Sequence, residues 1–358
     1  MSSVAQQGVL VLGMHRSGTS TITAGLEALG FALGQSKRRS AQGNEKGFFE
    51  NWEVVSINNR LLRAMGGSWD APPPQDQPAT DPAAVASLAK QAVEVLRKHY
   101  GDAPRWALKD PRLCLTLPFW RSAIESAGLG QVRIVHIVRS PLEVALSQQR
   151  RHQHNPDFHI LGGDIRYTLL LWYEYYRRAI ADLAQEQSLL VRHAEMMEKP
   201  GICLQNLATL LEVPAQADVI QWFEHEFVEP ELHRQRRDHS ELTLRFPDFG
   251  FVQALFERLL LLDPRQRFSA QELRARVLAA AASAASSDAR CVEALMRVAF
   301  EAGVVAGHQR LRMIAERKEN ARILQEVTDS EKRLAGELQA IKRSRAWKLV
   351  QFVRRLGA

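Results

Sequence analysis

The first residues of the chain follow a pattern of apolar strand, small-residue loop and apolar helix. Residues 8–12 are apolar and partly β-branched, which predicts a short buried strand. Residues 21–29 then repeat apolar positions at helical spacing and end at Gly30. Between them lies a glycine-bearing loop at residues 13–20. Because backbone N–H groups and the positive end of a helix dipole meet at such a loop, the pattern predicts an anion site.

Apolar strands and amphipathic helices continue to alternate as far as about residue 245. Further strands are predicted at residues 105–109, 132–138 and 189–192. This alternation predicts an α/β fold, a P-loop-like doubly wound parallel sheet with helices on both faces, whose ligands bind at the carboxyl ends of the strands. The predicted helices cover residues 53–65, 82–100, a stretch ending near 127, a stretch starting at 141, and residues 164–185, 202–211 and 217–227.

The pattern changes beyond residue 245. We predict three parts: an α/β domain at 1–245, a helical extension at 246–306, and a charged tail at 307–358. The tail shows an imperfect coiled-coil spacing and ends in a basic amphipathic stretch. It predicts a homo-oligomer formed through the coiled coil, or peripheral contact with an anionic membrane; a docking helix is the alternative.

Composition narrows the class of ligand and the compartment. The net charge of +7 suits anionic ligands. The cations gather at strand ends rather than along one helix with interleaved aromatics, which argues against nucleic acid as a partner. The three cysteines have no metal spacing, so we predict no metal site and a reducing compartment. Without a charged leader before an apolar core or an apolar run of roughly 18 residues, we expect a cytoplasmic protein, peripheral at most at the inner membrane face.

The loop at residues 13–20 resembles a P-loop but differs in its cation. The spacing from Gly13 to Gly18 is kept, but Thr19 stands where a nucleotide hydrolase has lysine. The cation is instead Arg16, whose planar fork can bind the oxygens of a phosphate-like group. The predicted anion-binding residues of this loop are His15, Arg16, Ser17, Gly18, Thr19 and Ser20, with backbone N–H groups from Ser17 to Ser20.

Two other strand ends carry matching chemistry. Arg139 ends the strand at 132–138, and Ser147 follows in the next helix, so the two side chains can clamp a dianionic phosphate. Lys109 ends the strand at 105–109 and is followed by Asp110, Pro111 and Arg112. Because parallel strands end at one edge of the sheet, these cations are expected to gather near the loop.

The order of these motifs resembles the sulfotransferases that use 3′-phosphoadenosine 5′-phosphosulfate (PAPS), among them bacterial carbohydrate sulfotransferases. The likeness covers about residues 8–240 and rests on Arg-Ser-Gly-Thr-Ser, Gly-aromatic-aromatic-Glu, Lys-Asp-Pro-Arg and Arg-x₇-Ser. It implies PAPS as the donor. Arg16 and Lys109 would then act on the transferring sulfuryl group, while Arg139 and Ser147 would bind the 3′-phosphate.

The acceptor hydroxyl needs a general base within hydrogen-bond reach. Glu50 is the first choice, because Phe48 and Phe49 could partly desolvate its carboxylate and stack on a sugar, and some similar enzymes use a glutamate from this segment. Rivals are Glu45, His15 and Asp110, and a helix-capping role for residues 50–51 is the alternative. Three histidines, His152, His154 and His159, are expected to line the acceptor cleft or to be solvated.

The acceptor class is suggested by the tail. Residues 338–349 are similar to a tail found on bacterial surface-polysaccharide glycosyltransferases, which implies a bacterial enzyme acting on a polysaccharide or glycolipid. The predicted function is in-line transfer of a sulfuryl group from PAPS to a carbohydrate hydroxyl. A P-loop kinase or hydrolase is the alternative, disfavoured by Thr19 and by the lack of an apolar strand ending in a Mg²⁺-binding Asp. A non-catalytic nucleotide- or glycan-binding module is the third possibility.

Overall fold

The computed structural model describes residues 6–34, 47–75, 78–154, 160–228 and 241–281, together with residues 329 and 332. The chain divides into two compact units, Met1–Val305 and Ala306–Ala358, and every element below belongs to the first. The predicted coiled coil and basic tail lie outside the described residues except at those two positions, and so do Glu45 and His159.

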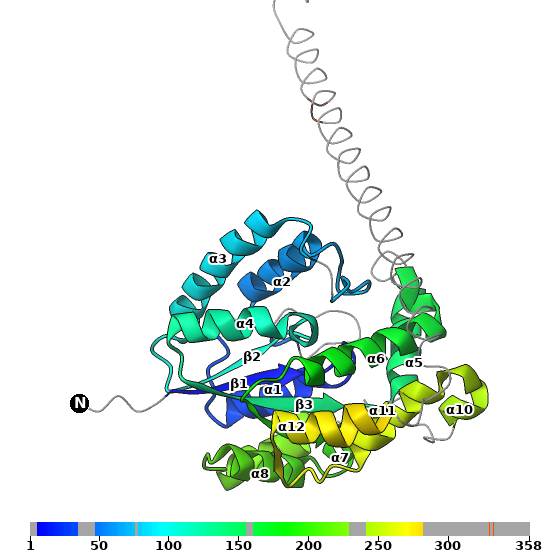
Figure 1. Ribbon diagram of the computed structural model, residues 1–358. Coiled ribbons are helices and arrows are strands. Elements are labelled where there is room, and N and C mark those ends of the chain that lie inside the picture. Colours follow the sequence, from blue (N-terminus) through cyan, green and yellow to red (C-terminus); the bar gives the residue numbers. More distant parts are fainter. Residues whose placement is uncertain are drawn as a thin grey trace, which may run out of the picture. The chain divides into compact units, whose positions relative to one another are not determined.

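One five-stranded sheet forms the centre of the first unit, in the order β2-β1-β3-β4-β5 (Figure 1). The first four strands pair in parallel, whereas β5 is antiparallel to β4. The predicted α/β class and mostly parallel sheet are therefore confirmed, while β5 was not predicted. The strands are β1 (Gln7–Leu12), β2 (Arg105–Lys109), β3 (Gln131–Val138), β4 (Gln187–Arg192) and β5 (Arg267–Phe268).

Helices cover both faces of this sheet, as predicted. Those of the described residues are α1 (Thr19–Ala28), α2 (Trp52–Ala64), α3 (Pro82–Tyr100), α4 (Leu113–Ala127), α5 (Pro141–His154), α6 (Ile165–Ala181), α7 (His193–Glu198), α8 (Pro200–Leu211), α9 (Ala217–Trp222), α10 (Glu241–Arg245), α11 (Gly250–Leu260) and α12 (Ala270–Leu273).

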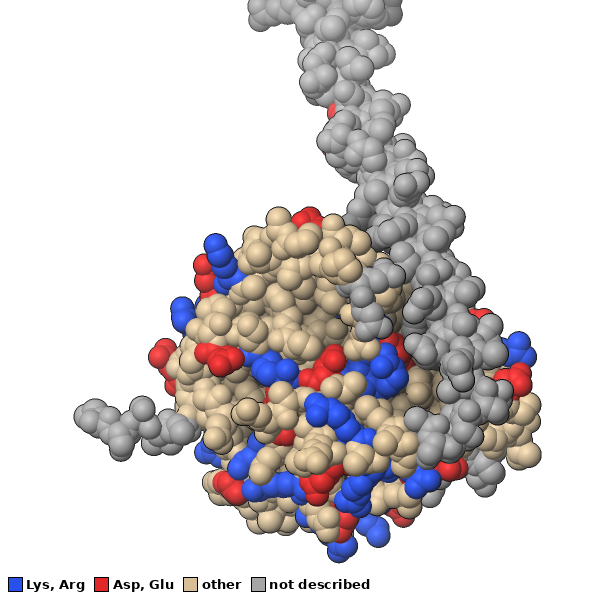
Figure 2. Space-filling model, viewed as in Figure 1, with Lys and Arg blue, Asp and Glu red and all other residues tan. Residues whose placement is uncertain are grey.

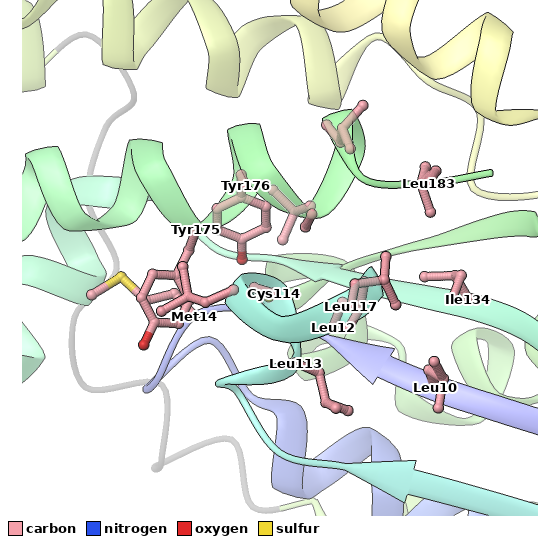
Figure 3. Close-up of a cluster of buried hydrophobic side chains, with 14 of the residues drawn as sticks. Leu10, Leu12, Met14, Leu113, Cys114, Leu117, Ile134, Tyr175, Tyr176 and Leu183 are labelled. Atoms are coloured by element: carbon pink, nitrogen blue, oxygen red, sulfur yellow. The ribbon is translucent and has the colours of Figure 1, made fainter. Parts of the chain in front are cut away.

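The two faces build two hydrophobic cores. Because successive strand residues point to opposite faces, Leu10 and Leu12 pack with α2–α6, while Val9 and Val11 pack with α1, α7 and α8. Figure 3 shows Leu10 and Leu12 of β1 in the first core, with Cys114 of α4 and Tyr176 of α6 nearby. Burial on both faces explains why the strands are almost continuously apolar rather than alternating.

The stretch after residue 245, predicted as a helical extension, takes part in this same fold where it is described. β5 extends the sheet, and α11 and α12 bury Leu255, Phe256 and Leu273 in the first core. The division of the chain at residue 245 stays a prediction about sequence character. Among the described residues, no helix has the length and apolar content needed to cross a bilayer.

Candidate active site

The anion loop connects β1 to α1, and two of its residues adopt a left-handed backbone conformation. Arg16 has a φ of 73° and Gly18 a φ of 90°, in the left-handed region that favours glycine. Gly18 is the N-cap of α1 and supplies no side-chain cap. The backbone N–H groups of Gly18, Thr19 and Ser20 make no hydrogen bond within the described residues. Three donors are thus left for an anion at the positive end of α1.

Gly18 is also required by its surroundings. A Cβ at this position would lie 2.6 Å from His193 Cδ2 and 3.1 Å from the Met196 Cε. His193 and Met196 belong to α7, which directly follows β4. α7 therefore packs against one side of the loop, and the backbone amides of Gly18, Thr19 and Ser20 remain available to a ligand.

Arg16 is held by residues that follow β3. Its Nε donates to Ser147 Oγ over 3.0 Å, and its carbonyl oxygen accepts from Arg139 Nη1 over 2.9 Å. Arg139 also donates through Nε to Glu143 Oε2 over 3.0 Å. Burial lowers the pKa of Arg139 although Glu143 opposes the shift. The structure thus brings together Arg16, Arg139 and Ser147, which the sequence analysis expected to gather at one edge of the sheet.

Lys109 connects the other side of the loop to Glu50. Its Nζ donates to Glu50 Oε1 over 2.7 Å, to the Phe48 carbonyl over 2.8 Å and to Ser20 Oγ over 3.3 Å. Lys109 is 3% exposed and Glu50 8% exposed, so the pair is nearly buried. Glu50 Oε2 makes no hydrogen bond within the described part of the chain. One carboxylate oxygen is anchored, and the other remains open to a ligand.

Asp110 does not fit the role of a rival base. It is fully buried, and it accepts from Asn58 Nδ2 and Arg112 Nη1, each over 2.9 Å. An acceptor hydroxyl cannot approach it without breaking these contacts. Asp110 instead orients the side chain of Arg112.

Ser17 is placed differently from the expectation for the loop. The Ser17 amide donates to the Met14 carbonyl over 3.1 Å, and its hydroxyl lies 3.1 Å from Tyr176 Oη in the core. Ser17 is fully buried, so it stabilises the loop from the core side and offers no hydrogen-bond donor to a bound anion. The His15 ring lies against Trp69 at 4.6 Å between centroids.

The aromatic pair beside Glu50 is split between two environments. Phe49 is 3% exposed, has a φ of 52° and packs its ring against Phe227 in the second core. It cannot stack on a sugar, and the sequence-based suggestion is wrong for this residue because the apolar ring is buried as core. Phe48 is half-buried.

His152 and His154, which follow Ser147 in the sequence, lie near the C-terminal end of α5. His154 Nδ1 pairs with the Arg150 carbonyl over 2.7 Å within its own helix. His152 lies next to Gly163, where an added Cβ would come within 2.8 Å of its ring. No cluster of three or more His, Cys, Asp or Glu side chains within the described ranges is suited to hold a metal ion.

Charges of both signs are interspersed over the face shown in Figure 2. The upper part of this face is mostly uncharged, and Lys, Arg, Asp and Glu alternate below it. A protein that tracks a nucleic-acid backbone usually presents a continuous basic stripe instead. The visible face therefore favours a local anion site over an extended polyanion surface.

Comparison with known proteins identifies the family of the chain. The sequence model of the sulfotransferase family matches residues 8–218, which contain the loop, Glu50, Lys109, Arg139 and Ser147. The chain belongs to the sulfotransferase family and is an enzyme of that family, in which PAPS is the usual donor. No curated protein matches the chain.

Several solved structures are similar to the chain at low identity. The sulfotransferase domain of the Synechococcus PCC 7002 olefin synthase is 17% identical, covers 71% of this chain and 95% of its own, and has a TM-score of 0.38. The sulfotransferase domain of the curacin biosynthetic pathway is 14% identical, with 68% and 98% coverage and a TM-score of 0.36. Sulfotransferase STF1 from Mycobacterium tuberculosis H37Rv is 13% identical, with 68% and 77% coverage and a TM-score of 0.38. At these scores, the family assignment rests on the sequence match.

Proposed function

We propose that the protein transfers a sulfuryl group from PAPS to a hydroxyl of a carbohydrate, in a surface polysaccharide or a glycolipid. The observation that carries the proposal is the meeting of three strand ends around one open anion loop. The loop follows β1, the Arg139–Ser147 clamp follows β3, and Lys109 with Glu50 lies at the end of β2. A donor with phosphate groups at both ends matches this arrangement.

Several groups on the donor side of the site can bind the phosphates of PAPS. The amides of Gly18, Thr19 and Ser20 and the side chain of Arg16 would hold the 5′-phosphosulfate. Arg139 uses Nε and Nη1 within the protein, whereas its Nη2 makes no hydrogen bond to a described residue. That atom and the Ser147 hydroxyl hydrogen would hold the 3′-phosphate, which distinguishes PAPS from ATP.

The residues of the chain divide the transfer step between them. PAPS, when bound, supplies the sulfuryl group. Glu50 Oε2 accepts the proton of the acceptor hydroxyl as its oxygen bonds to sulfur. Arg16 and Lys109 stabilise the charge that develops on the departing phosphate oxygen and on the sulfuryl oxygens as the sulfur–oxygen bond to phosphate breaks. In-line transfer requires mainly such positioning and charge stabilisation, so no metal is included in the proposal.

Two observations support a carbohydrate as the acceptor. One is the resemblance of the motifs and of residues 338–349 to bacterial glycan enzymes. The other is Trp69, a half-buried ring beside His15 and the anion loop, of the kind that stacks on sugar rings. The predicted oligomer and membrane contact of the tail, and a cytoplasmic location, remain predictions.

A thermal-shift titration tests the donor assignment. Adenosine 3′,5′-bisphosphate (PAP) without metal should stabilise the protein by about 2.7 kcal/mol at a hundredfold excess over its dissociation constant. ATP with Mg²⁺ should stabilise it far less. A preference for ATP with Mg²⁺ would favour a P-loop kinase or hydrolase, and binding of PAP without transfer of radiolabelled sulfate would favour a binding module. An Arg139→Ala protein that keeps its PAP affinity would place the 3′-phosphate elsewhere.

A further inference from the structure

Arg112 is a half-buried cation after the end of β2, with a side chain that is 12% exposed, and its hydrogen-bonding capacity is only partly used. Its backbone amide and its Nη1 both donate to Asp110 Oδ1, over 3.0 and 2.9 Å. Its Nε is buried and has no hydrogen-bond partner in the structure. Nε and Nη2 form the side edge of a guanidinium, the fork that binds a carboxylate or phosphate through two parallel hydrogen bonds. This edge makes no hydrogen bond to any described residue.

A buried network fixes the orientation of Arg112. Asp110 is fully buried and accepts a second hydrogen bond from Asn58 Nδ2 over 2.9 Å. Asn58 Oδ1 in turn accepts from Thr116 Oγ1 over 2.9 Å and from Trp120 Nε1 over 2.7 Å. Asn58 is therefore held by α4, Asp110 by Asn58, and Arg112 by Asp110. A side chain positioned this firmly, with one edge unsatisfied, is suited to bind an anion.

Arg112 interacts electrostatically with the proposed base, Glu50. Burial disfavours its charge, but Asp110 and then Glu50 and Tyr175 outweigh this and raise the pKa of Arg112. A second guanidinium, Arg151, lies one helical turn beyond Ser147 on α5 and also interacts electrostatically with Glu50. Positive charge therefore surrounds the carboxylate from β2 and from α5.

The order of the strands places Arg112 on the acceptor side. The 3′-phosphate clamp follows β3, the loop follows β1, and Arg112 follows β2, and these strands are neighbours in that order. A donor that runs from the clamp to the loop directs its leaving oxygen toward β3. In-line transfer puts the acceptor oxygen opposite the leaving oxygen. The acceptor therefore enters from the β2 side, where Arg112 and Glu50 lie.

We propose that the Nε–Nη2 edge of Arg112 binds an oxyanion of the acceptor, so that the substrate carries a carboxylate or phosphate close to the hydroxyl that receives the sulfuryl group. This inference rests on the proposed function and narrows it to acidic acceptors. The anion would pair with Arg112 while Glu50 Oε2 receives the hydroxyl. A neutral sugar would leave the Arg112 edge unsatisfied.

The test compares three probes on the full chain, with and without saturating PAP. They are p-nitrophenyl β-D-glucuronide, the neutral p-nitrophenyl β-D-glucoside and its 6-phosphate, measured by isothermal titration and by radiolabelled sulfate transfer. The wild-type protein should bind at least one acidic probe about tenfold or more tightly than the neutral one. The tighter of the two acidic probes tells carboxylate from phosphate.

Arg112→Lys tests the fork, because it keeps the charge opposite Asp110 but loses bidentate geometry. We expect it to reduce the preference for the acidic probe about tenfold, and Arg112→Gln to abolish it. Arg63→Lys is the matched control, since Arg63 is exposed on α2 and donates to the Asn59 carbonyl of the same helix; it should keep the preference.

Three results would overturn the inference: equal affinity for acidic and neutral probes, failure to bind any of them, or a loss in Arg112→Lys that falls on PAP affinity instead of acceptor preference. Failure of the proposed function is a separate result. A protein that prefers the acidic probe but binds no PAP would keep the anion subsite and lose the donor.

Discussion

Glu50 and Asn51 are neighbours in the chain with separate roles. Asn51 Oδ1 accepts from the Glu53 amide over 3.0 Å and the Val54 amide over 3.4 Å, and so caps α2. The capping alternative for residues 50–51 therefore applies to Asn51 alone. Glu50 anchors Oε1 on Lys109, which leaves Oε2 for the proton of an acceptor hydroxyl.

Glu50→Gln should lower the rate of sulfuryl transfer by about 10²–10⁴-fold, the usual contribution of a general base. The amide oxygen can still accept from Lys109, so the affinity for PAP should change little. Radiolabelled sulfate transfer measures the first quantity and thermal-shift titration the second.

The control for this variant is Glu53→Gln, which removes an exposed carboxylate three residues away that pairs with Lys98. It should transfer sulfate normally. If Glu50→Gln were as active as Glu53→Gln, the base would be another residue.

The buried His136 makes the free energy of unfolding depend on pH. It is 3% exposed on β3, its Nε2 lies 3.2 Å from Ser188 Oγ, and burial lowers its pKa from 6.5 to about 4. The unfolded chain therefore binds a proton that the folded protein does not bind between these two values. The free energy of unfolding should fall by about 3 kcal/mol from this group as the pH drops from 6.5 to 4, and should be unaffected by it above pH 7.

Urea denaturation of the wild type and of His136→Gln at pH 7 and pH 4 measures this contribution. Both proteins lose stability in acid through their carboxylates, so the difference between them isolates the histidine. Equal losses in the two proteins would contradict the assignment.

Spacing along the chain predicted most of the residues that meet at the loop. Arg16, Lys109, Arg139 and Ser147 each follow a strand at a recognisable distance, and parallel strands end at one edge. Spacing could not predict how side chains turn. The inward rotation of Ser17 onto Tyr176 and the unsatisfied edge of Arg112 depend on contacts with α6 and α4, which a single sequence does not show.

Elements with a strong apolar pattern were predicted to within one to three residues at most ends. β2 and α3 have the bounds that the sequence indicates. For α3, the capping Asp81 marks the start of the helix and Gly101 marks its end. α7 and β5 were missed. α7 has only six residues and β5 only two, too short for any periodic pattern. The break of α4 at Thr116 lies next to the predictable helix breaker Pro118.

Gly18→Ala should damage the junction between the loop and α1. The φ of 90° is strained for alanine, and the added Cβ would lie 2.6 Å from His193 Cδ2. We expect a loss of about 1–3 kcal/mol of stability and weaker PAP binding, because the amides of residues 18–20 must shift. Denaturation and PAP titration measure the two effects.

Gly30→Ala is the control that separates the effect of backbone strain from that of steric overlap. Gly30 has a φ of 88°, and a Cβ there would meet no atom within 4 Å. It should show the strain alone and keep normal PAP affinity. A Gly18→Ala protein that behaves like Gly30→Ala would show that contact with α7 does not shape the anion loop.

The sheet and its two cores connect parts of the sequence that differ in character. The sequence before residue 245 predicts alternating strands and helices with clear periodicity, whereas the sequence after it predicts a helical extension. In the structure, Phe268 of β5 is 2% exposed and belongs to the same core as Leu10 and Trp172. An apolar residue there should stabilise the α/β fold as a single cooperative unit.

Phe268→Ala should therefore lower the free energy of unfolding of the whole α/β fold by about 3–5 kcal/mol, the usual cost of truncating a buried Phe. Fluorescence of the fully buried Trp106, Trp120 and Trp172, all before residue 245, reports on the part that does not contain the change. Leu261→Ala, at a side chain that is 68% exposed, is the control and should alter stability by less than about 0.5 kcal/mol. If the tryptophan transition of Phe268→Ala stayed at the wild-type denaturant concentration, the stretch after residue 245 would be a separable extension. A single transition shifted to lower denaturant means that the sheet needs β5 and α12, and that the strand ends which form the active site are stabilised in part by residues outside the matched family region.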